Sequence, residues 1–368
     1  MAQKDTYERL AERLSLLGMG FPKEETLLDI LRENFSPLEA EAALALPTRT
    51  TPLNPVELEE IEKASSIPRE ELKEILEGLV RKGLLYAGKT GSGERGYALH
   101  QVGYGFPQTF FWKGEESPHA RKMAKLTVKY FNRRVVREGY TADPKPYRYV
   151  PVREAIQGWG RAAVYPHHAM ESVIDQADVL AVGHCPCRII YRLNGRTCTH
   201  PTEVCIKFND LARYVIDRGL AREITREEAW EIIRLAEEAG LVHFVDNTEK
   251  NIQHNCNCCG CACWNVGNIR RRKIPRDVLM ATYFLRETLE EECTGCGLCA
   301  EICPVDAIRM EEESPVVDTE WCIGCGVCVT KCPTGAARIE LRADRSGELP
   351  AKTFQGLHEK ILKAKGLA

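Results

Sequence analysis

The strongest constraint on this chain is a repeated arrangement of cysteines near its carboxyl-terminal end. In each copy, three cysteines are separated by two residues each, and a fourth follows after three intervening residues and precedes a proline. The two copies contain Cys293, Cys296, Cys299 and Cys303, and then Cys322, Cys325, Cys328 and Cys332. Gaps of two residues let three thiolates converge on one inorganic core, while the fourth points toward a neighbouring core. The repeat therefore predicts two metal centres in one short stretch of chain.

The stretch from about Glu291 to Leu341 resembles the bacterial two-cluster ferredoxin domain. The resemblance implies two [4Fe-4S] clusters and electron transfer between them at low potential. It also implies a crossed assignment, in which the fourth cysteine of each copy binds the cluster of the other copy. One cluster would take Cys293, Cys296, Cys299 and Cys332, and the other would take Cys322, Cys325, Cys328 and Cys303. Zinc is the alternative, but zinc sites usually show separated cysteine pairs.

Small residues flank the cysteines in both copies. The flanking glycines are Gly295, Gly297, Gly324 and Gly326. They leave room for backbone amides to approach the inorganic sulfides, and they permit positive φ angles. Amide hydrogen bonds to cluster sulfur influence the reduction potential. A short apolar pair follows each Cys-Pro, Ala307-Ile308 and then Ala336-Ala337, and we expect these pairs to keep water away from the clusters.

Cysteine is unusually frequent in the whole chain, which contains 17 of these residues. We expect a reducing compartment, where such cysteines act as metal ligands and do not form a disulfide framework. The nine cysteines outside the repeat all lie between Cys185 and Cys263. This clustering predicts a second metal region. Iron–sulfur clusters of this kind suit an anaerobic organism or a shielded site.

The remaining composition is that of an ordinary globular protein. A length of 368 residues predicts two or three domains, and a net charge of −3 supplies no global attraction to nucleic acid or membrane. No apolar run approaches the roughly 18 residues of a membrane span. The segment from Met1 to Leu17 is charged and lacks the apolar core of an export signal. We therefore expect a cytoplasmic protein.

The first central group of cysteines follows an apolar segment. The predicted strand from Val179 to Val182 leads into His184-Cys185-Pro186-Cys187-Arg188, and a strand that ends in ligands holds them rigidly. Cys198 and Cys205 come next, with His200 between them. Together Cys185, Cys187, Cys198 and Cys205 offer the four thiolates that a cubane cluster needs. A structural zinc ion, or free regulatory thiols, are the alternatives.

The second central group places five cysteines in eight residues. They are Cys256, Cys258, Cys259, Cys261 and Cys263. Neighbouring residues of a strand point to opposite faces, so Cys258 and Cys259 cannot point the same way. Either the loop wraps one cluster, or the thiolates serve two metal centres. The two groups together predict one or two further iron–sulfur clusters, and nine cysteines exceed the eight that two cubanes use.

The triplet Cys258-Cys259-Gly260 resembles the signature of heterodisulfide reductase catalytic subunits. In that family, paired motifs build unusual clusters that carry out disulfide chemistry. This chain has one such triplet and lacks the long-spaced partner motif. His184, His200 and Arg188 could donate protons or hold an anion beside a central cluster, or they could pack as supporting residues. The basic run Arg270 to Lys273 is either a docking surface or a solvated turn.

The amino-terminal part resembles a winged helix. Two helices are predicted from Val56 to Ala64 and from Ile67 to Lys82, followed by a two-stranded wing around the glycine-rich tip Lys89 to Gly96. From Asn54 to Lys82 there are eight glutamates against five lysines or arginines, and the second helix opens with acidic residues. Such a helix is poorly suited to a major groove lined by phosphates. The charge pattern therefore argues against nucleic-acid binding and favours a structural or docking module.

Several further elements are predicted from periodicity and end signals. The predicted helices are His119–Val136, one around His167–Asp178, Lys207–Arg218, one from a capping box at Thr225 to Ala239, Asp277–Leu289, and Leu357–Ala364; Leu241–Val245 is a predicted strand. The predicted class is α+β, with a central α/β domain. The predicted domains are a helical and winged-helix-like domain (1–105), a cysteine-rich iron–sulfur domain (106–290), a ferredoxin-like domain (291–342) and a tail (343–368).

These features predict an electron-transfer protein or a subunit of a redox complex, and so a component of an oxidoreductase. The ferredoxin-like clusters would exchange electrons with the central cysteine region and with a redox partner protein. Two alternatives stay open: a reductase that binds substrate at a central cluster, and a redox-sensing regulator that uses the winged helix. The sequence contains no Gly-x-Gly-x-x-Gly motif after a strand and no Walker loop, so it offers no support for nucleotide binding.

Overall fold

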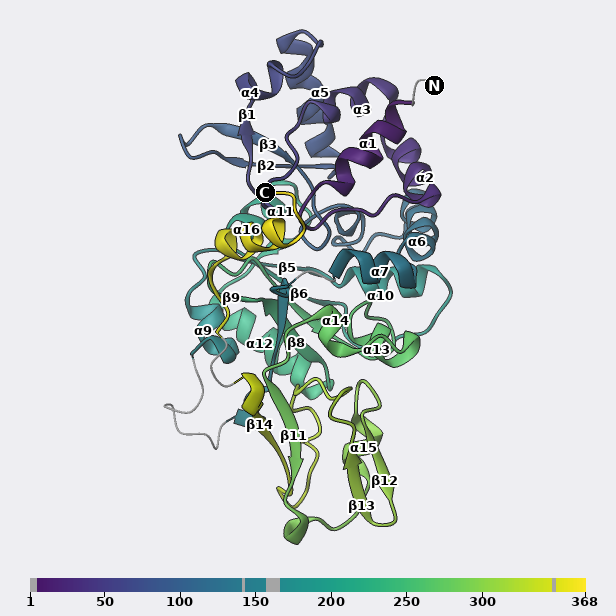
Figure 1. The fold of residues 1–368 in the computed structure, drawn as a ribbon, viewed down its shortest axis with the longest axis vertical. Coiled ribbons are helices and arrows are strands. Elements are labelled where there is room, and N and C mark those ends of the chain that lie inside the picture. Colours follow the sequence, from purple (N-terminus) through teal and green to yellow (C-terminus); the bar gives the residue numbers. More distant parts are fainter. Residues whose placement is uncertain (1–4, 141–142, 157–165, 346–348) are drawn as a thin grey trace.

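The structure is a computed structural model that describes residues 5–140, 143–156, 166–345 and 349–368. It is a mixed α+β protein with 41% helix and 18% strand, which confirms the predicted class. Three parts follow one another along the longest axis (Figure 1). The amino-terminal helices form one end, a six-stranded sheet lies in the middle, and the strands around the cysteine repeat form the other end. The domain limits drawn from the sequence stay predictions.

The amino-terminal part combines five helices with a three-stranded sheet of order β1-β3-β2. Its elements are α1 (Thr6–Ser15), α2 (Glu25–Asn34), α3 (Pro37–Leu44), β1 (Val56–Glu57), α4 (Leu58–Glu62), α5 (Arg69–Arg81), β2 (Leu85–Lys89) and β3 (Arg95–Leu99). The two predicted helices are present as α4 and α5, and the predicted two strands as β2 and β3. The assignment to the winged-helix fold stays a prediction.

The helix predicted over 119–136 is wrong in one respect, because the chain forms two helices there. They are α6 (Pro118–Tyr130) and α7 (Arg133–Tyr140). The side-chain oxygen of Asn132 accepts hydrogen bonds from the backbone N–H groups of Arg134 and Val135, at 2.9 and 3.1 Å. A side chain that satisfies the free amides in this way starts a new helix. The short 3₁₀ helix η1 (Gln108–Phe110) precedes this pair.

The central sheet has the strand order β4-β8-β10-β6-β5-β7, and all its neighbouring strands are antiparallel. The prediction of a central α/β domain is therefore wrong, because α/β domains are built on parallel strands. The strands are β4 (Tyr147–Val150), β5 (Leu180–His184), β6 (Glu203–Phe208), β7 (Arg222–Glu223), β8 (Val242–Asp246) and β10 (His254–Cys258). The strands predicted from Val179 and from Leu241 are thus confirmed, each displaced by about one residue. The helix predicted from Lys207 begins two residues later, because Lys207 and Phe208 still belong to β6.

Helices cover both faces of this sheet. The helices of this region are α8 (Arg153–Ile156), α9 (Met170–Asp175), α10 (Pro186–Leu193), α11 (Asn209–Asp217), α12 (Arg226–Glu238), α13 (Val266–Arg272), α14 (Arg276–Leu279) and the 3₁₀ helix η2 (Pro166–His168). Apolar residues of α9 and α12 pack on one face with Val204 and Ile206. Residues of α10 and α11 belong to the core on the other face, with Cys205 and Phe244. The alternation along β6 follows from the two-residue period of a strand. The predicted capping box is present, since Thr225 and Glu228 cap α12 reciprocally.

The predicted helix from Asp277 to Leu289 is wrong. Only α14 is helical there, and residues 284–288 form β11 (Phe284–Thr288), which pairs antiparallel with β14 (Ala337–Leu341). Tertiary pairing with a strand about fifty residues away overrides the local helical pattern. The other elements around the repeat are η3 (Glu290–Glu292), α15 (Leu298–Ile302), β12 (Ile308–Glu311), β13 (Ser314–Val317) and η4 (Ala343–Arg345).

The carboxyl-terminal segment returns to the middle of the molecule (Figure 1). Strand β15 (Ala351–Thr353) pairs in parallel with β9 (Thr248–Lys250), and helix α16 (Phe354–Ala364) follows. The buried Tyr104 hydroxyl donates to Asp246 at 2.8 Å and lies 3.1 Å from His358 Nε2 of α16. This contact joins the amino-terminal part, the central sheet and the last helix. The predicted final helix is present and begins three residues earlier than expected.

Candidate metal centres

Two cavities lie inside the cysteine repeat, and each is bordered by four thiols. Residues of both copies contribute to each cavity. The first is lined by Cys293, Cys296, Cys299 and Cys332, and the second by Cys303, Cys322, Cys325 and Cys328. This is the crossed grouping that the ferredoxin resemblance implies. We refer to the first set as the outer group, because Cys296 is exposed and none of its members is buried, and to the second as the inner group, because all four are buried.

The backbone around both groups suits a polynuclear cluster. Amide groups already point at sulfur, with the N–H of Ala307 3.2 Å from Cys303 Sγ and that of Ala337 3.4 Å from Cys332 Sγ. Gly324 has a φ of +61°, and a Cβ added there would collide with the backbone carbonyl of Phe284. Only glycine allows this close approach without strain. Burial raises the pKa of Cys325, as expected for a thiol that is stable as an anion only beside a metal.

Six of the nine central cysteines meet on one face of the central sheet. We call them the six-thiol group, and they are Cys185, Cys187, Cys205, Cys256, Cys258 and Cys263. Cys256 and Cys258 share a face of β10, and the pairing of β10 with β6 brings Cys205 beside Cys256. Cys187 interacts with both Cys185 and Cys263, and Cys263 Sγ lies 3.1 Å from Cys258 Sγ. The group therefore joins residues from β6, β10, α10 and the loop after β10.

A buried cation accompanies the six-thiol group. Lys207 is 2% exposed, and its Nζ donates to Cys205 Sγ at 2.8 Å while lying 4.8 Å from the ring centre of Trp112. Burial acts to lower the pKa of Lys207, but the attraction of the Cys205 and Cys256 thiolates outweighs it and raises the pKa. The hydrogen bond from Cys205 in turn helps to lower the pKa of Cys256 to about 5. The thiolate form of Cys256, which is the form that binds metal, is thus favoured, while the same hydrogen bond raises the pKa of Cys205.

The cavity beside the six-thiol group has a volume of about 70 Å³. Each cavity of the cysteine repeat has a volume of about 20 Å³ by the same measure. Aromatic side chains complete the central cavity, among them Trp112, Tyr147 and Trp264. Six thiols exceed the four that one cubane requires. The central site could therefore hold a larger cluster, or a cubane with space for a small ligand.

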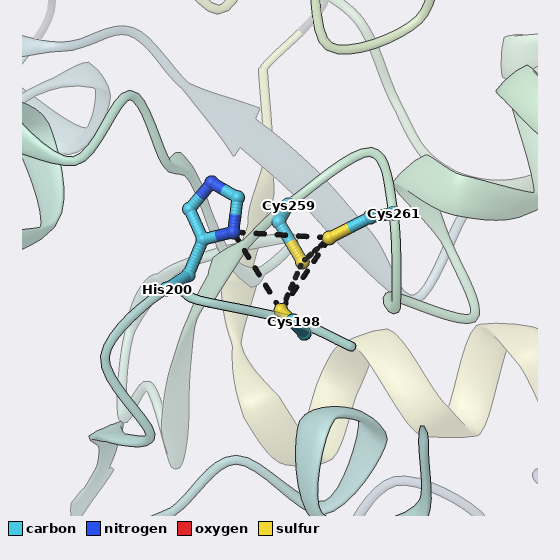
Figure 2. Close-up of side chains that lie close together, drawn as sticks. All are labelled: Cys198, His200, Cys259 and Cys261. Carbon is cyan, nitrogen blue, oxygen red and sulfur yellow. Dashed lines mark hydrogen bonds between the residues drawn. The ribbon is translucent and has the colours of Figure 1, made fainter. Parts of the chain in front are cut away.

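The remaining three central cysteines lie with a histidine on the other face of the sheet, in contact with the core around α9 and α12. Figure 2 shows Cys198, His200, Cys259 and Cys261 directed toward a common point. Cys261 Sγ is 3.2 Å from Cys259 Sγ and 3.4 Å from Cys198 Sγ, and the two remaining cysteines are 4.0 Å apart. His200 Nδ1 lies 3.6 Å from Cys198 Sγ.

This spacing fits a single metal ion. Zn–S bonds of about 2.3 Å in a tetrahedral arrangement imply sulfur–sulfur distances of roughly 3.8 Å, and three cysteines with one histidine form a familiar structural zinc site. Thiolates bound to different irons of a cubane lie farther apart, because iron and sulfide stand between them. In agreement, no sulfur–sulfur hydrogen bond links the eight repeat cysteines, all of which the structure describes.

The predicted sets of central ligands are thus regrouped by the structure. Cys198 does not lie with Cys185, Cys187 and Cys205, and the adjacent Cys258 and Cys259 belong to different groups. For the loop from Cys256 to Cys263, the sequence left two alternatives: one cluster, or two metal centres. The geometry favours two centres, because its thiols fall into two separate groups. The sequence predicts His200 as a proton donor, an anion holder or a supporting residue, and not as a direct metal ligand. The spacing of Cys198 and His200, which are two residues apart, is the sequence feature from which His200 could have been predicted as a ligand.

The other candidate residues have structural contacts. Arg188 donates to the backbone carbonyls of Pro201 and Asn257, each at 2.6 Å, and so ties the two central cysteine segments together. His184 Nδ1 lies 3.0 Å from the hydroxyl of Thr202. In the basic run, Arg270 pairs with Asp306 at 2.9 Å, and Arg272 donates to the carbonyl of Phe131. These arginines are engaged in holding the fold.

The inner group lies next to the six-thiol group. The backbone N–H of Val152 donates to the carbonyl of Cys325 at 2.9 Å. Tyr149 is buried near both groups: burial raises its pKa, and negative charge on Cys263, Cys258 and Cys325 adds to this effect. A Cβ added to Gly260 would collide with the carbonyl of Pro304, which follows Cys303. The thiol groups therefore form a series from the exposed outer group through the inner group to the six-thiol group.

Comparison with protein families gives one match. Residues 292–336 match the 4Fe-4S dicluster domain, which implies two [4Fe-4S] clusters and electron transfer. The match covers the cysteine repeat and leaves the rest of the chain unassigned. No match is found among curated proteins or among solved structures. None of the helices that the structure describes is both long and apolar enough to cross a membrane.

Proposed function

We propose that this protein is an iron–sulfur component of an oxidoreductase. It exchanges electrons with a partner protein at the outer group and with a metal centre at the six-thiol group. The clusters, when bound, supply one-electron steps at low potential. The protein chain determines the order in which the sites follow one another and shields the inner sites from water. It also provides, at one end of the molecule, the surface that a partner protein would contact.

The observation that carries this proposal is a series of three adjacent thiol groups, which begins at the exposed Cys296 and continues through the buried inner group to the mostly buried six-thiol group. Cys296 in the outer group is exposed, the inner group is buried, and the six-thiol group lies behind it. Tyr149 and the Val152 backbone fill the space between Cys325 and the central thiols. An arrangement with one exposed end and one enclosed end supports a route between a partner and an internal site.

The catalytic alternative has one specific observation in its favour. The central cavity is larger than the cavities of the repeat, about 70 against about 20 Å³, and it has two more thiols than a cubane uses. An open coordination position with Lys207 nearby would suit reduction of a small substrate. A relay protein would need no such space.

We assign a structural role to the other central metal site. Cys198, His200, Cys259 and Cys261 would hold one zinc ion, which has no redox chemistry in proteins. The ion would join the loop after α10 to the loop after β10. By doing so it would fix the position of Cys258 and Cys263 on the opposite face of the sheet.

For the amino-terminal part we propose a docking role and no function in DNA binding. Glu70 and Glu71 lie exposed at the start of α5, the second of the two helices predicted in the winged-helix-like part. The wing is tied to the central domain, because the Tyr214 hydroxyl of α11 donates to the carbonyl of Leu85 at 3.0 Å. Binding of duplex DNA with a steep salt dependence would contradict this role.

Iron and sulfide analysis of the anaerobically purified protein, with EPR after dithionite reduction, tests the proposal. About eight irons per chain would leave only the two repeat clusters and would contradict a central iron–sulfur centre. Roughly twelve or more irons per chain, with EPR signals beyond those of two cubanes, would support it. Turnover of a substrate by the isolated protein with a low-potential donor would favour the reductase alternative.

The route itself is tested by freeze-quench EPR on the variants Cys325→Ala and Cys296→Ala. We expect that loss of the inner site leaves the outer cluster reducible and slows reduction of the central centre. Loss of the outer site should slow reduction of both other centres by a protein donor. Reduction of the central centre at the wild-type rate in Cys325→Ala would contradict the proposed order.

A further inference from the structure

One arginine lies between the two cavities of the cysteine repeat. Arg286 stands in the middle of β11, opposite Ile339 of β14, and its side chain lines both the outer and the inner cavity. It is 6% exposed. Its position on a paired strand, between two sets of loops, fixes the guanidinium in the wall that the two cavities share.

The described residues provide no carboxylate partner for this guanidinium. Nη1 donates to the hydroxyl of Thr288, Nη2 lies 3.8 Å from Cys299 Sγ, and Nε has no hydrogen-bond partner. Arg276, also buried, differs because Nη1 donates to the backbone carbonyls of Thr319 and Cys322. A buried cation without a counterion is costly. The available anionic groups at Arg286 are the cysteine thiolates and the clusters they would hold.

We propose that Arg286 supplies one positive charge that both repeat clusters share, and that this charge raises the reduction potential of each. Reduction adds a negative charge to a cluster, so a cation in the shared wall stabilises the reduced form of both. The guanidinium is buried, so its charge is screened less than that of an arginine on the surface. The inference rests on the two clusters that the family match implies, and not on the central metal centre.

The test is an EPR-monitored redox titration of the intact, cluster-loaded protein. The variant Arg286→Met keeps the bulk of the side chain and removes the charge, and Arg286→Lys keeps the charge. We expect both midpoint potentials to fall in Arg286→Met and to stay near the wild-type values in Arg286→Lys. The matched control is Arg309→Met, because Arg309 lies in the same region but is exposed and paired with Glu311 at 2.8 Å. There we expect no shift.

Two results would overturn the inference: unchanged potentials in Arg286→Met at full iron content, or a shift in only one of the clusters. Arg286→Gln is the second neutral variant in case the methionine variant loses iron. If both neutral variants lose iron while Arg286→Lys keeps the wild-type iron content and potentials, the positive charge at this position is still what the clusters require. Iron loss in all three variants would show that the shape of arginine matters, and would also overturn the inference. None of these outcomes depends on the central iron count.

Discussion

The two cysteine-rich regions of this protein assemble their sulfur atoms in different ways. In the repeat, eight cysteines from one short stretch surround two cavities, and no sulfur–sulfur hydrogen bond links them. In the central domain, thiols from distant segments approach one another closely, as in the 3.4 Å contact between Cys198 and Cys261. The first arrangement leaves space for iron and sulfide between the thiols. The second brings several thiols within reach of one metal atom.

This difference shows what each region needs from the rest of the fold. In the repeat, residue spacing, glycines and backbone amides set the positions of the thiols, and two two-stranded sheets, β11-β14 and β12-β13, support them. The central groups depend on strand pairing, because Cys205 and Cys256 become neighbours only when β6 pairs with β10. We therefore expect mutations in the sheet to affect the central metals and to spare the repeat clusters.

The largest expected effect concerns two adjacent residues, Cys258 and Cys259. We expect Cys259→Ala to remove one zinc ion per chain and to lower the iron content less than Cys258→Ala does, because Cys259 lies in the set with Cys198 and Cys261. We expect Cys258→Ala to lower iron and leave zinc in place. Structural zinc contributes on the order of 10 kcal/mol to folding of small domains, so the first variant should also destabilise the central domain strongly.

Metal analysis by mass spectrometry, with thermal unfolding of both variants, checks this prediction. The two substitutions remove the same atoms one residue apart, so each serves as the control for the other. If both variants lose iron to the same extent and the wild-type protein contains no zinc, the separation into a six-thiol group and a single-ion site is wrong.

The contrast also explains what could be predicted from the sequence. The crossed grouping of Cys303 and Cys332 is implied by the resemblance to two-cluster ferredoxins, which rests on a local motif, and the cavities of the structure are lined by the same two sets. The central grouping could not be derived in this way. Cys259 and Cys261, which contact Cys198, lie some sixty residues further along the chain, and only the folded sheet and its loops bring them together. The helix predicted over 277–289 failed for the same reason, since β14 recruits residues 284–288 into a strand.

The second prediction removes a buried carboxylate that supports the central sheet. Asp246 accepts hydrogen bonds from the Tyr104 hydroxyl at 2.8 Å and from the backbone N–H groups of Gln253 and His254 at 2.6 and 3.2 Å. Asp246→Ala leaves these donors without an acceptor, and we expect a loss of about 3–5 kcal/mol in unfolding free energy. Because β10 continues to Cys256, occupancy of the six-thiol group should also fall.

Urea denaturation, together with EPR of the repeat clusters, measures both effects. The control is Asp344→Ala, since Asp344 is exposed and pairs with Arg342 at 2.8 Å. It should change stability very little, because solvent screens an exposed ion pair. Equal loss of repeat and central signals in Asp246→Ala would contradict the independence of the two regions.

The third prediction concerns the backbone of the repeat. Gly324 and Gly297 both have positive φ angles, of +61° and +76°. A Cβ at Gly324 would collide with the carbonyl of Phe284, whereas at Gly297 the nearest atom is Met310 Cγ at 3.9 Å. Gly297→Ala should therefore cost only about 1–2 kcal/mol for the left-handed conformation, and Gly324→Ala should cost more and weaken the inner cluster. The absorbance of the clusters, followed during urea titration, compares the two variants. If both lose absorbance at the same urea concentration, the predicted collision at Gly324 has no consequence.

The smallest effect is a pH dependence that arises outside the repeat, because residues 291–342 contain no histidine. Burial lowers the pKa of His358 to about 3, with Asp246 opposing the shift and His254 and Lys365 adding to it. The unfolded chain binds this proton below a pH of about 6.5, and the folded chain does not, so stability falls as the pH drops below that value. At about pH 5.5 the loss of unfolding free energy is roughly 1.4 kcal/mol for this residue.

In urea titrations, His358→Gln should lose less stability than the wild-type protein between about pH 7.5 and pH 5.5. Parallel curves for the two proteins would show that His358 gains its proton while folded, and that the contact between α16 and Tyr104 opens before the central sheet unfolds.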